Sequence, residues 1–179
     1  MFANKLTSMR NPNFNFVGMV IFTLCLCLAA ASCTKEDDEN SKAKDYSQIN
    51  IAHIQDIDTT LSNKEFLATN ASGFILKPND VLVFKTSEGR YGKMQIIGYN
   101  LASNYDMSVK ATIFNADGTT KASDVSFVVR GTWLGELDVP REALREEFTG
   151  KADFHWNRQN DTDTNFTPAN GAKFAKYTF

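Results

Sequence analysis

VLVFKTSEGRYGKMQIIGY, at residues 81–99, is the clearest indicator of secondary structure in this chain. Its first half is rich in the β-branched and aromatic residues that favour strands, and Ser87-Glu88-Gly89 then supplies residues typical of a turn. In its second half, Met94 and Ile96 alternate with polar residues, which is the pattern of a strand with one apolar and one polar face. We therefore predict a β-hairpin across Gly89.

The same period of two continues on both sides of this hairpin. Pro78-Asn79-Asp80 predicts a turn before it, and residues 107–113 alternate apolar with polar side chains up to a second turn at Asn115-Ala116-Asp117-Gly118. Further strands are predicted at 125–129, 133–139, 154–157 and 173–179. Seven or eight short strands with turns about every ten residues predict an all-β chain, a single β-sandwich of immunoglobulin-like architecture. A partly open β-barrel is the alternative.

One segment departs from the β pattern. Asp138 and Pro140 precede the run Ala143-Leu144-Arg145-Glu146-Glu147-Phe148, and Gly150 follows it. A polar cap, an early proline and a late glycine are typical of a helix that begins and ends within a few residues. We predict one short surface helix over residues 143–148.

The N-terminal residues have the composition of an export signal. Lys5 and Arg10 precede an uncharged apolar run over 17–31, which has 15 residues. This is the arrangement of a secretory signal peptide, and the run is shorter than the about 20 residues that a spanning helix needs. A transmembrane anchor is the alternative interpretation.

The end of this run, Leu28-Ala29-Ala30-Ala31-Ser32-Cys33, resembles the lipobox of bacterial lipoproteins, in which the cysteine carries the lipid. Ala30 stands where that family usually has Leu, so ordinary cleavage after Ala31 is the alternative. Lys35-Glu36-Asp37-Asp38-Glu39 is similar to the acidic export signal of Bacteroidota surface lipoproteins. These resemblances imply a chain acylated (palmitate-type) at Cys33, anchored in the lipid bilayer of the outer membrane and facing the cell exterior.

We therefore divide the chain into a signal peptide at 1–32, a lipidated Cys33 with a flexible acidic tether at 33–45, and a β-sandwich domain at 46–179. Removing 32 of the 179 residues leaves 147, which include 17 basic and 21 acidic side chains and carry a formal net charge near −4. This balance lacks the basic footprint of nucleic-acid binding, so we exclude a nucleic-acid partner. All cysteines lie at or before Cys33, which excludes a disulfide within the domain.

The residues that could carry chemistry are sparse. His53 and His155 are the only histidines, so we expect no zinc site, no cofactor and no enzymatic activity. Five acidic residues surround the predicted helix: Glu136, Asp138, Glu142, Glu146 and Glu147. Two of them could supply a catalytic carboxylate pair, but helix capping and ion pairs explain their presence better. Asp161, Asp163 and Asn165 in a polar loop are a weak candidate for a calcium site. The loop lacks the glycine and the glutamate that an EF-hand calcium loop has at its sixth and twelfth positions.

Aromatic residues give the main functional hypothesis. Trp133 and Trp156 could act as flat platforms for sugar rings, with Asn157 and Arg158 orienting the ligand. Tryptophans in strands are more often packed in the core, so exposure decides this point. We expect an extracellular ligand-binding module, with a polysaccharide as the ligand. The alternative is a structural or partner-binding subunit of an envelope protein complex.

Overall fold

The computed structural model describes residues 45–178. The predicted signal peptide, Cys33 and the predicted tether up to residue 44 lie outside the described residues. Within 45–178, no helix combines the length and the apolar composition that a membrane crossing requires.

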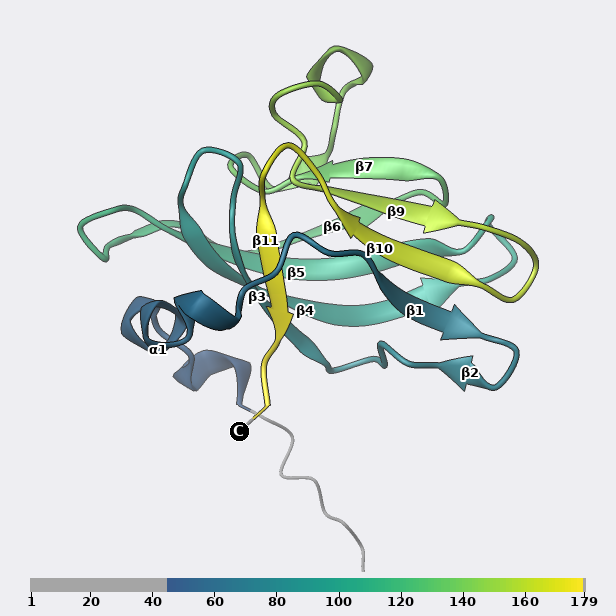
Figure 1. Cartoon of the computed structure of the whole chain (residues 1–179), viewed down its shortest axis with the longest axis horizontal. Coiled ribbons are helices and arrows are strands. Elements are labelled where there is room, and N and C mark those ends of the chain that lie inside the picture. Colours follow the sequence, from purple (N-terminus) through teal and green to yellow (C-terminus); the bar gives the residue numbers. More distant parts are fainter. Residues whose placement is uncertain (1–44, 179) are drawn as a thin grey trace, which may run out of the picture. The chain divides into compact units, whose positions relative to one another are not determined.

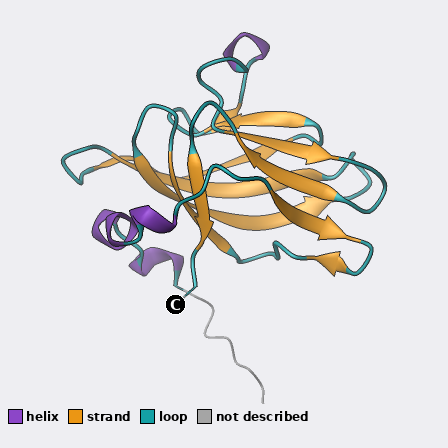
Figure 2. Cartoon of the chain, in the orientation of Figure 1, coloured by secondary structure: helices purple, strands orange, loops and turns teal. Residues whose placement is uncertain are grey.

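Two antiparallel sheets make up the described part of the chain (Figures 1 and 2). The six-stranded sheet has the order β2-β1-β10-β9-β7-β8, and the five-stranded sheet has the order β11-β3-β4-β5-β6. The strands are β1 (Phe66–Asn70), β2 (Gly73–Phe74), β3 (Val81–Lys85), β4 (Tyr91–Asn100), β5 (Asp106–Phe114), β6 (Thr120–Val129), β7 (Trp133–Glu136), β8 (Arg141–Glu142), β9 (Phe154–Arg158), β10 (Thr164–Pro168) and β11 (Lys173–Lys176). The predicted all-β sandwich is confirmed, with more strands than the seven or eight expected.

The predicted hairpin is confirmed as β3 and β4, with Phe84 opposite Gly92 in its register. Gly89 has φ 86° in the turn between these strands, and Gly118 has the same value in the predicted turn between β5 and β6. This backbone region suits glycine because a Cβ atom would clash there. Four consecutive strands, β3 to β6, therefore form a meander.

The main core lies between the sheets and is dominated by aromatic rings. Phe154 and Phe166 stack with centroids 4.6 Å apart, and Phe174 meets Phe166 edge-on at 4.9 Å. Met94 and Ile96, the predicted apolar positions of β4, are fully buried in this core. The alternation predicted from the sequence thus orients β4 correctly.

The predicted helix over 143–148 is wrong. Arg141–Glu142 forms β8, and only a 3-10 turn, η3 (Arg145–Glu147), follows it. The carboxylate of Glu147 accepts hydrogen bonds from the Leu144 backbone N–H and from Arg141, which holds the segment as a tight loop. Local helix signals are overridden here because the two residues before the segment pair with β7, and the Ala143 backbone N–H then donates to the Leu134 carbonyl at 2.9 Å.

The described residues instead contain an α-helix where none was predicted, α1 (Ile51–Asp56), between the 3-10 turns η1 (Tyr46–Gln48) and η2 (Asp58–Thr60). Asn50 caps it by accepting a hydrogen bond from the His53 backbone N–H. This N-terminal segment packs on the outer face of the five-stranded sheet, where a second apolar cluster forms: Tyr46, Ile49, Ile54, Leu61, Val81, Val83 and Phe114. The outer face is therefore covered at one end of the sheet.

Candidate functional site

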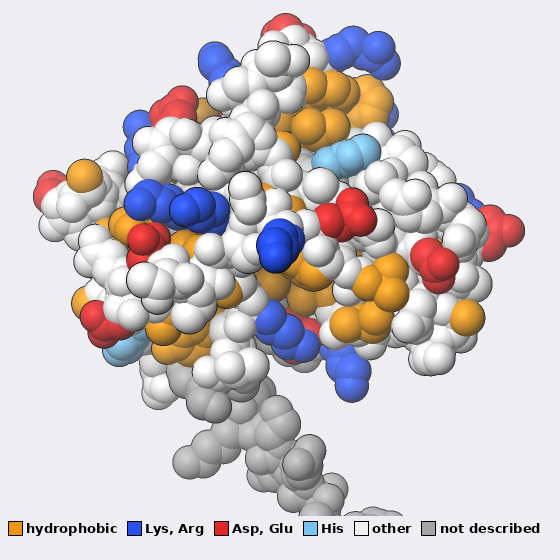
Figure 3. Space-filling model, viewed as in Figure 1, with side chains coloured by type: hydrophobic (Ala, Val, Ile, Leu, Met, Phe, Trp, Pro, Cys, Tyr) orange, Lys and Arg blue, Asp and Glu red, His pale blue; other side chains and the backbone are white. Residues whose placement is uncertain are grey.

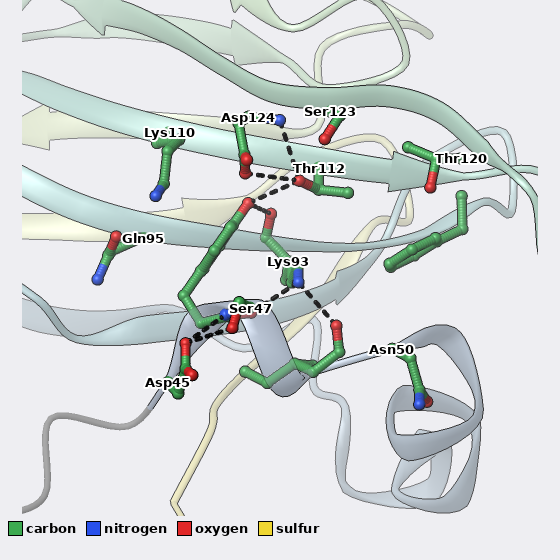
Figure 4. Close-up of a pocket in the computed structure, with 13 residues that line it drawn as sticks. Asp45, Ser47, Asn50, Lys93, Gln95, Lys110, Thr112, Thr120, Ser123 and Asp124 are labelled. Carbon is green, nitrogen blue, oxygen red and sulfur yellow. Dashed lines mark hydrogen bonds between the residues drawn. The ribbon is translucent and has the colours of Figure 1, made fainter.

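A cavity of about 700 Å³ lies where the N-terminal segment passes over β4, β5 and β6 (Figure 4). Its rim is polar on both sides. The N-terminal segment contributes Asp45, Ser47 and Asn50, and the strands contribute Gln95, Lys110, Thr120, Ser123 and Asp124. Lys93 and Gln95 are alternate residues of β4, so they point away from the main core and toward this cavity.

Lys93 anchors the floor of the cavity. Its side chain is held by the N-terminal segment, because Nζ donates to the carbonyl oxygens of Tyr46 at 2.6 Å and Ile49 at 2.7 Å. The ammonium group also lies 4.4 Å from the centroid of the Tyr46 ring. Burial lowers the pKa of Lys93, since a charged amine is less stable away from water.

A hydrogen-bonded chain runs from this floor to the rim. The Tyr46 hydroxyl donates to Thr112 Oγ1 at 3.0 Å, and Thr112 donates in turn to the carboxylate of Asp124 at 3.2 Å. The Asp124 backbone N–H donates back to Thr112 at 3.1 Å. Burial raises the pKa of Tyr46, so its phenol stays protonated and keeps this direction of donation.

The rim carries both positively and negatively charged side chains. The Lys110 ammonium lies 4.4 Å from the centroid of the Tyr46 ring, and Lys110 stands opposite Gln95 in the β4–β5 register. Asp124 is exposed, with φ 52°, at a register shift between β5 and β6. A ligand in the cavity would therefore meet a cation, an amide and a carboxylate within one concave surface.

Of the two tryptophans considered as sugar platforms, Trp156 is not accessible to a ligand. Trp156 is 0% exposed, stacks on Tyr99 with centroids 5.5 Å apart, and donates from Nε1 to the Tyr105 carbonyl at 2.6 Å. Its ring has no free face to offer a sugar. Exposure therefore decides against a platform at Trp156, which is packed in the core as strand tryptophans more often are, because its position on β9 faces the core.

Trp133 is half-buried at the edge of the same core, opposite Trp156 in the β7–β9 register. The Arg130 guanidinium lies 4.3 Å from its ring centroid, and Phe148 meets it edge-on at 5.2 Å. Its Nε1 donates to the Ala143 carbonyl at 3.0 Å. Trp133 is thus held in place by protein groups, and only part of its surface is accessible.

The two polar residues predicted beside the tryptophans lie at the end of β9. Asn157 is half-buried opposite Asn165. The Arg158 guanidinium donates to Asp161 at 2.6 Å and to Asn104 at 2.7 Å. Arg158 is therefore occupied in fixing the neighbouring loops.

The three residues of the predicted calcium site do not point toward one common position. Asp161 accepts from Arg158, while Asp163 accepts from the side chains of Asn160 and Thr162. Asn165 lies on β10 and donates to Glu65 at 2.6 Å. The three candidate ligands thus face different partners, and part of the predicted loop is a strand.

Sequence reasoning missed the cavity because its walls come from distant parts of the chain. The alternation of β4 placed Lys93 and Gln95 on the polar face, but nothing local indicates that Tyr46 covers them. No family model, no curated protein and no solved structure matches this chain. Function must therefore be inferred from the geometry of the site.

Proposed function

We propose that this chain is an outer-membrane lipoprotein, anchored through Cys33 and facing the cell exterior, whose β-sandwich domain binds an extracellular glycan without catalysing a reaction. The observation that supports glycan binding is the cavity above β4, β5 and β6, with its polar rim of ammonium, amide, hydroxyl and carboxylate groups. Its volume of about 700 Å³ is in the range of small-molecule sites.

The chemistry of the rim matches that of a sugar. Each sugar hydroxyl both donates and accepts, so a site for it needs donors and acceptors side by side. Lys110 donates, Asp124 accepts, and Gln95 does both. Lys110 and Gln95 are paired in the β4–β5 register, and two hydrogen bonds with Thr112 hold Asp124 at the register shift. The buried Lys93 and Tyr46 hold the covering segment in place, which pre-organises the rim and lowers the entropic cost of binding.

The test is calorimetric titration of the purified full-length chain, in detergent, with a panel of plant and host polysaccharides. We expect saturable binding of at least one glycan, and we expect Lys110→Ala and Asp124→Ala each to raise Kd about tenfold, or about 1.4 kcal/mol. Lys173→Ala is the matched control, because Lys173 is exposed on β11, away from the cavity. Equal affinity for the wild type and both rim variants would contradict the proposed site.

One observation favours the second candidate function, a partner-binding subunit of an envelope complex. A groove of about 320 Å³ lies between β1 and β11, and its walls include Leu67 at 39% and Ile75 at 45% exposure. Figure 3 shows apolar side chains gathered over β1 on this face. An apolar strand or side chain of an envelope protein would fit such a groove. Absence of glycan binding, with an association that Ile75→Asp abolishes, would favour this function.

A further inference from the structure

Three carboxylates that do not line the polar cavity gather near the ends of β7 and β9. Glu136 ends β7, Asp138 follows it, and Asp153 directly precedes β9. Their exposed fractions are 3%, 4% and 0%, and one oxygen from each lies within 4.8 Å of the others. Acidic side chains are rarely buried so deeply without a compensating partner.

The hydrogen bonds of this cluster leave one oxygen without a partner. Asp153 accepts from the backbone N–H groups of Ser87 at 2.6 Å and Leu137 at 2.7 Å. Asp138 Oδ1 pairs with Arg90 at 2.5 Å, but its buried Oδ2 has no hydrogen-bond partner. A buried carboxylate oxygen left unpaired costs free energy that a bound cation would recover.

The nearby charges do not balance. Arg90 contacts Glu88 as well as Asp138, and Lys121 donates to the Asp138 carbonyl at 2.7 Å. Arg90 is thus shared between two carboxylates, and among the described residues no ion pair reaches Glu136 or Asp153. The pKa of Asp153 is raised to about 7: burial is the largest cause, the two backbone hydrogen bonds oppose it, and the neighbouring charges of Glu136 and Asp138 add to the rise.

We propose that Glu136, Asp138 and Asp153 bind one calcium ion. Calcium takes oxygen ligands at about 2.3–2.6 Å, so ligands on opposite sides of the ion are about 4.6–5.2 Å apart. The separation of up to 4.8 Å among the three carboxylate oxygens fits this geometry. Magnesium usually keeps several waters, which side chains exposed by only 0–4% leave little room for.

The ion would lie where hydrogen bonds of Asp153 already link the two sheets. Asp153 binds the β3–β4 turn through Ser87 and the end of β7 through Leu137. The β3–β4 turn belongs to the five-stranded sheet, while β7 and β9 belong to the six-stranded sheet. Calcium bound to Asp153 is therefore expected to stabilise the folded chain, because it binds the native state and not the unfolded one.

The test uses the purified full-length chain after chelation, titrated with calcium chloride and followed by calorimetry and by thermal unfolding. We expect one bound ion and a rise in Tm with calcium concentration. Asp138→Asn should raise the calcium Kd at least tenfold and abolish the rise in Tm. Asp163→Asn is the matched control, because it changes an acidic residue of the loop that the sequence offered as a calcium site.

Two results would overturn this proposal. One is the absence of calcium binding by the wild type at millimolar concentration, the range of extracellular calcium modules. The other is binding that Asp163→Asn abolishes and Asp138→Asn leaves intact. If Asp138→Asn does not fold, Glu136→Gln takes its place, with circular dichroism to verify its structure. Neither readout involves a glycan, so failure here leaves the proposed function untouched.

Discussion

Lys93 shows how one residue fixes the geometry of the candidate site. It is 6% exposed and satisfies two backbone carbonyls of the N-terminal segment, those of Tyr46 and Ile49. Its ammonium lies 4.4 Å from the centroid of the Tyr46 ring. The lysine thus replaces solvent as the hydrogen-bond donor for a segment that has no strand partner at this point.

Substituting Lys93 by methionine should keep the volume but remove the donors. We expect Lys93→Met to lower the free energy of unfolding by about 1–3 kcal/mol, because two buried carbonyls lose a charged partner. Lys110→Met is the control: it loses only a partly exposed contact with the same ring, worth about 0.5–1 kcal/mol. Urea denaturation measures the free energy of unfolding of both variants. An equal decrease in the two would show that the hydrogen bonds from Lys93 to the two carbonyls do not contribute to stability.

At the scale of elements, glycines in strands accept aromatic rings from their neighbours. Gly92 on β4 stands opposite Phe84 on β3, and Gly135 on β7 stands opposite Phe154 on β9. A Cβ atom on Gly92 would lie 2.3 Å from the Phe84 ring and 2.7 Å from the Thr112 carbonyl oxygen. Each glycine therefore lets a phenyl ring lie flat against the neighbouring strand.

We expect Gly92→Ala to destabilise the fold by about 1–3 kcal/mol, because the ring and the adjacent strand would have to move. Gly98→Ala on the same strand is the matched control. Its Cβ would meet nothing within 4 Å, so a change within about 0.5 kcal/mol is expected. Thermal unfolding measures the stability of both variants. If Gly92→Ala were as stable as the wild type, β3 and β4 would be able to move apart without loss of stability.

For the whole molecule, the sheets are joined at one edge by the chain leading into β1. Ser62 and Phe174 exchange two backbone hydrogen bonds, of 3.0 and 2.9 Å, which extends the five-stranded sheet beyond β11. In contrast, β2 and β8 are two-residue strands at the two edges of the six-stranded sheet. Stability should therefore be unequal across the molecule.

Hydrogen exchange of backbone amides should report this difference. We expect the slowest exchange in β4 and β5, which are paired on both sides, and the fastest exchange among the strands in β2 and β8. Mass spectrometry of the native protein in D₂O measures it, and repetition in denatured protein corrects for intrinsic rates. Protection of β2 and β8 equal to that of β5 would mean that the whole sandwich opens as one unit.

Local patterns in the sequence determined the fold class and the central meander. Alternation fixed which face of β4 and β5 is apolar, and glycine-containing turns located the hairpins, because both signals act between residues close in the chain. The short strands β1 and β10 escaped notice, since β10 is mostly polar and β1 pairs with it across about 100 residues of sequence. The predicted helix over 143–148 failed because strand pairing outweighed local propensity.

The tertiary structure alone decided the sites. It buried Trp156 rather than exposing it, placed Tyr46 over Lys93, and brought Asp153 to Glu136 and Asp138. Each of these outcomes depends on contacts between segments that the sequence separates by 15 residues or more. Sequence periodicity states which face a side chain is on, but only the packed chain determines what lies against that face.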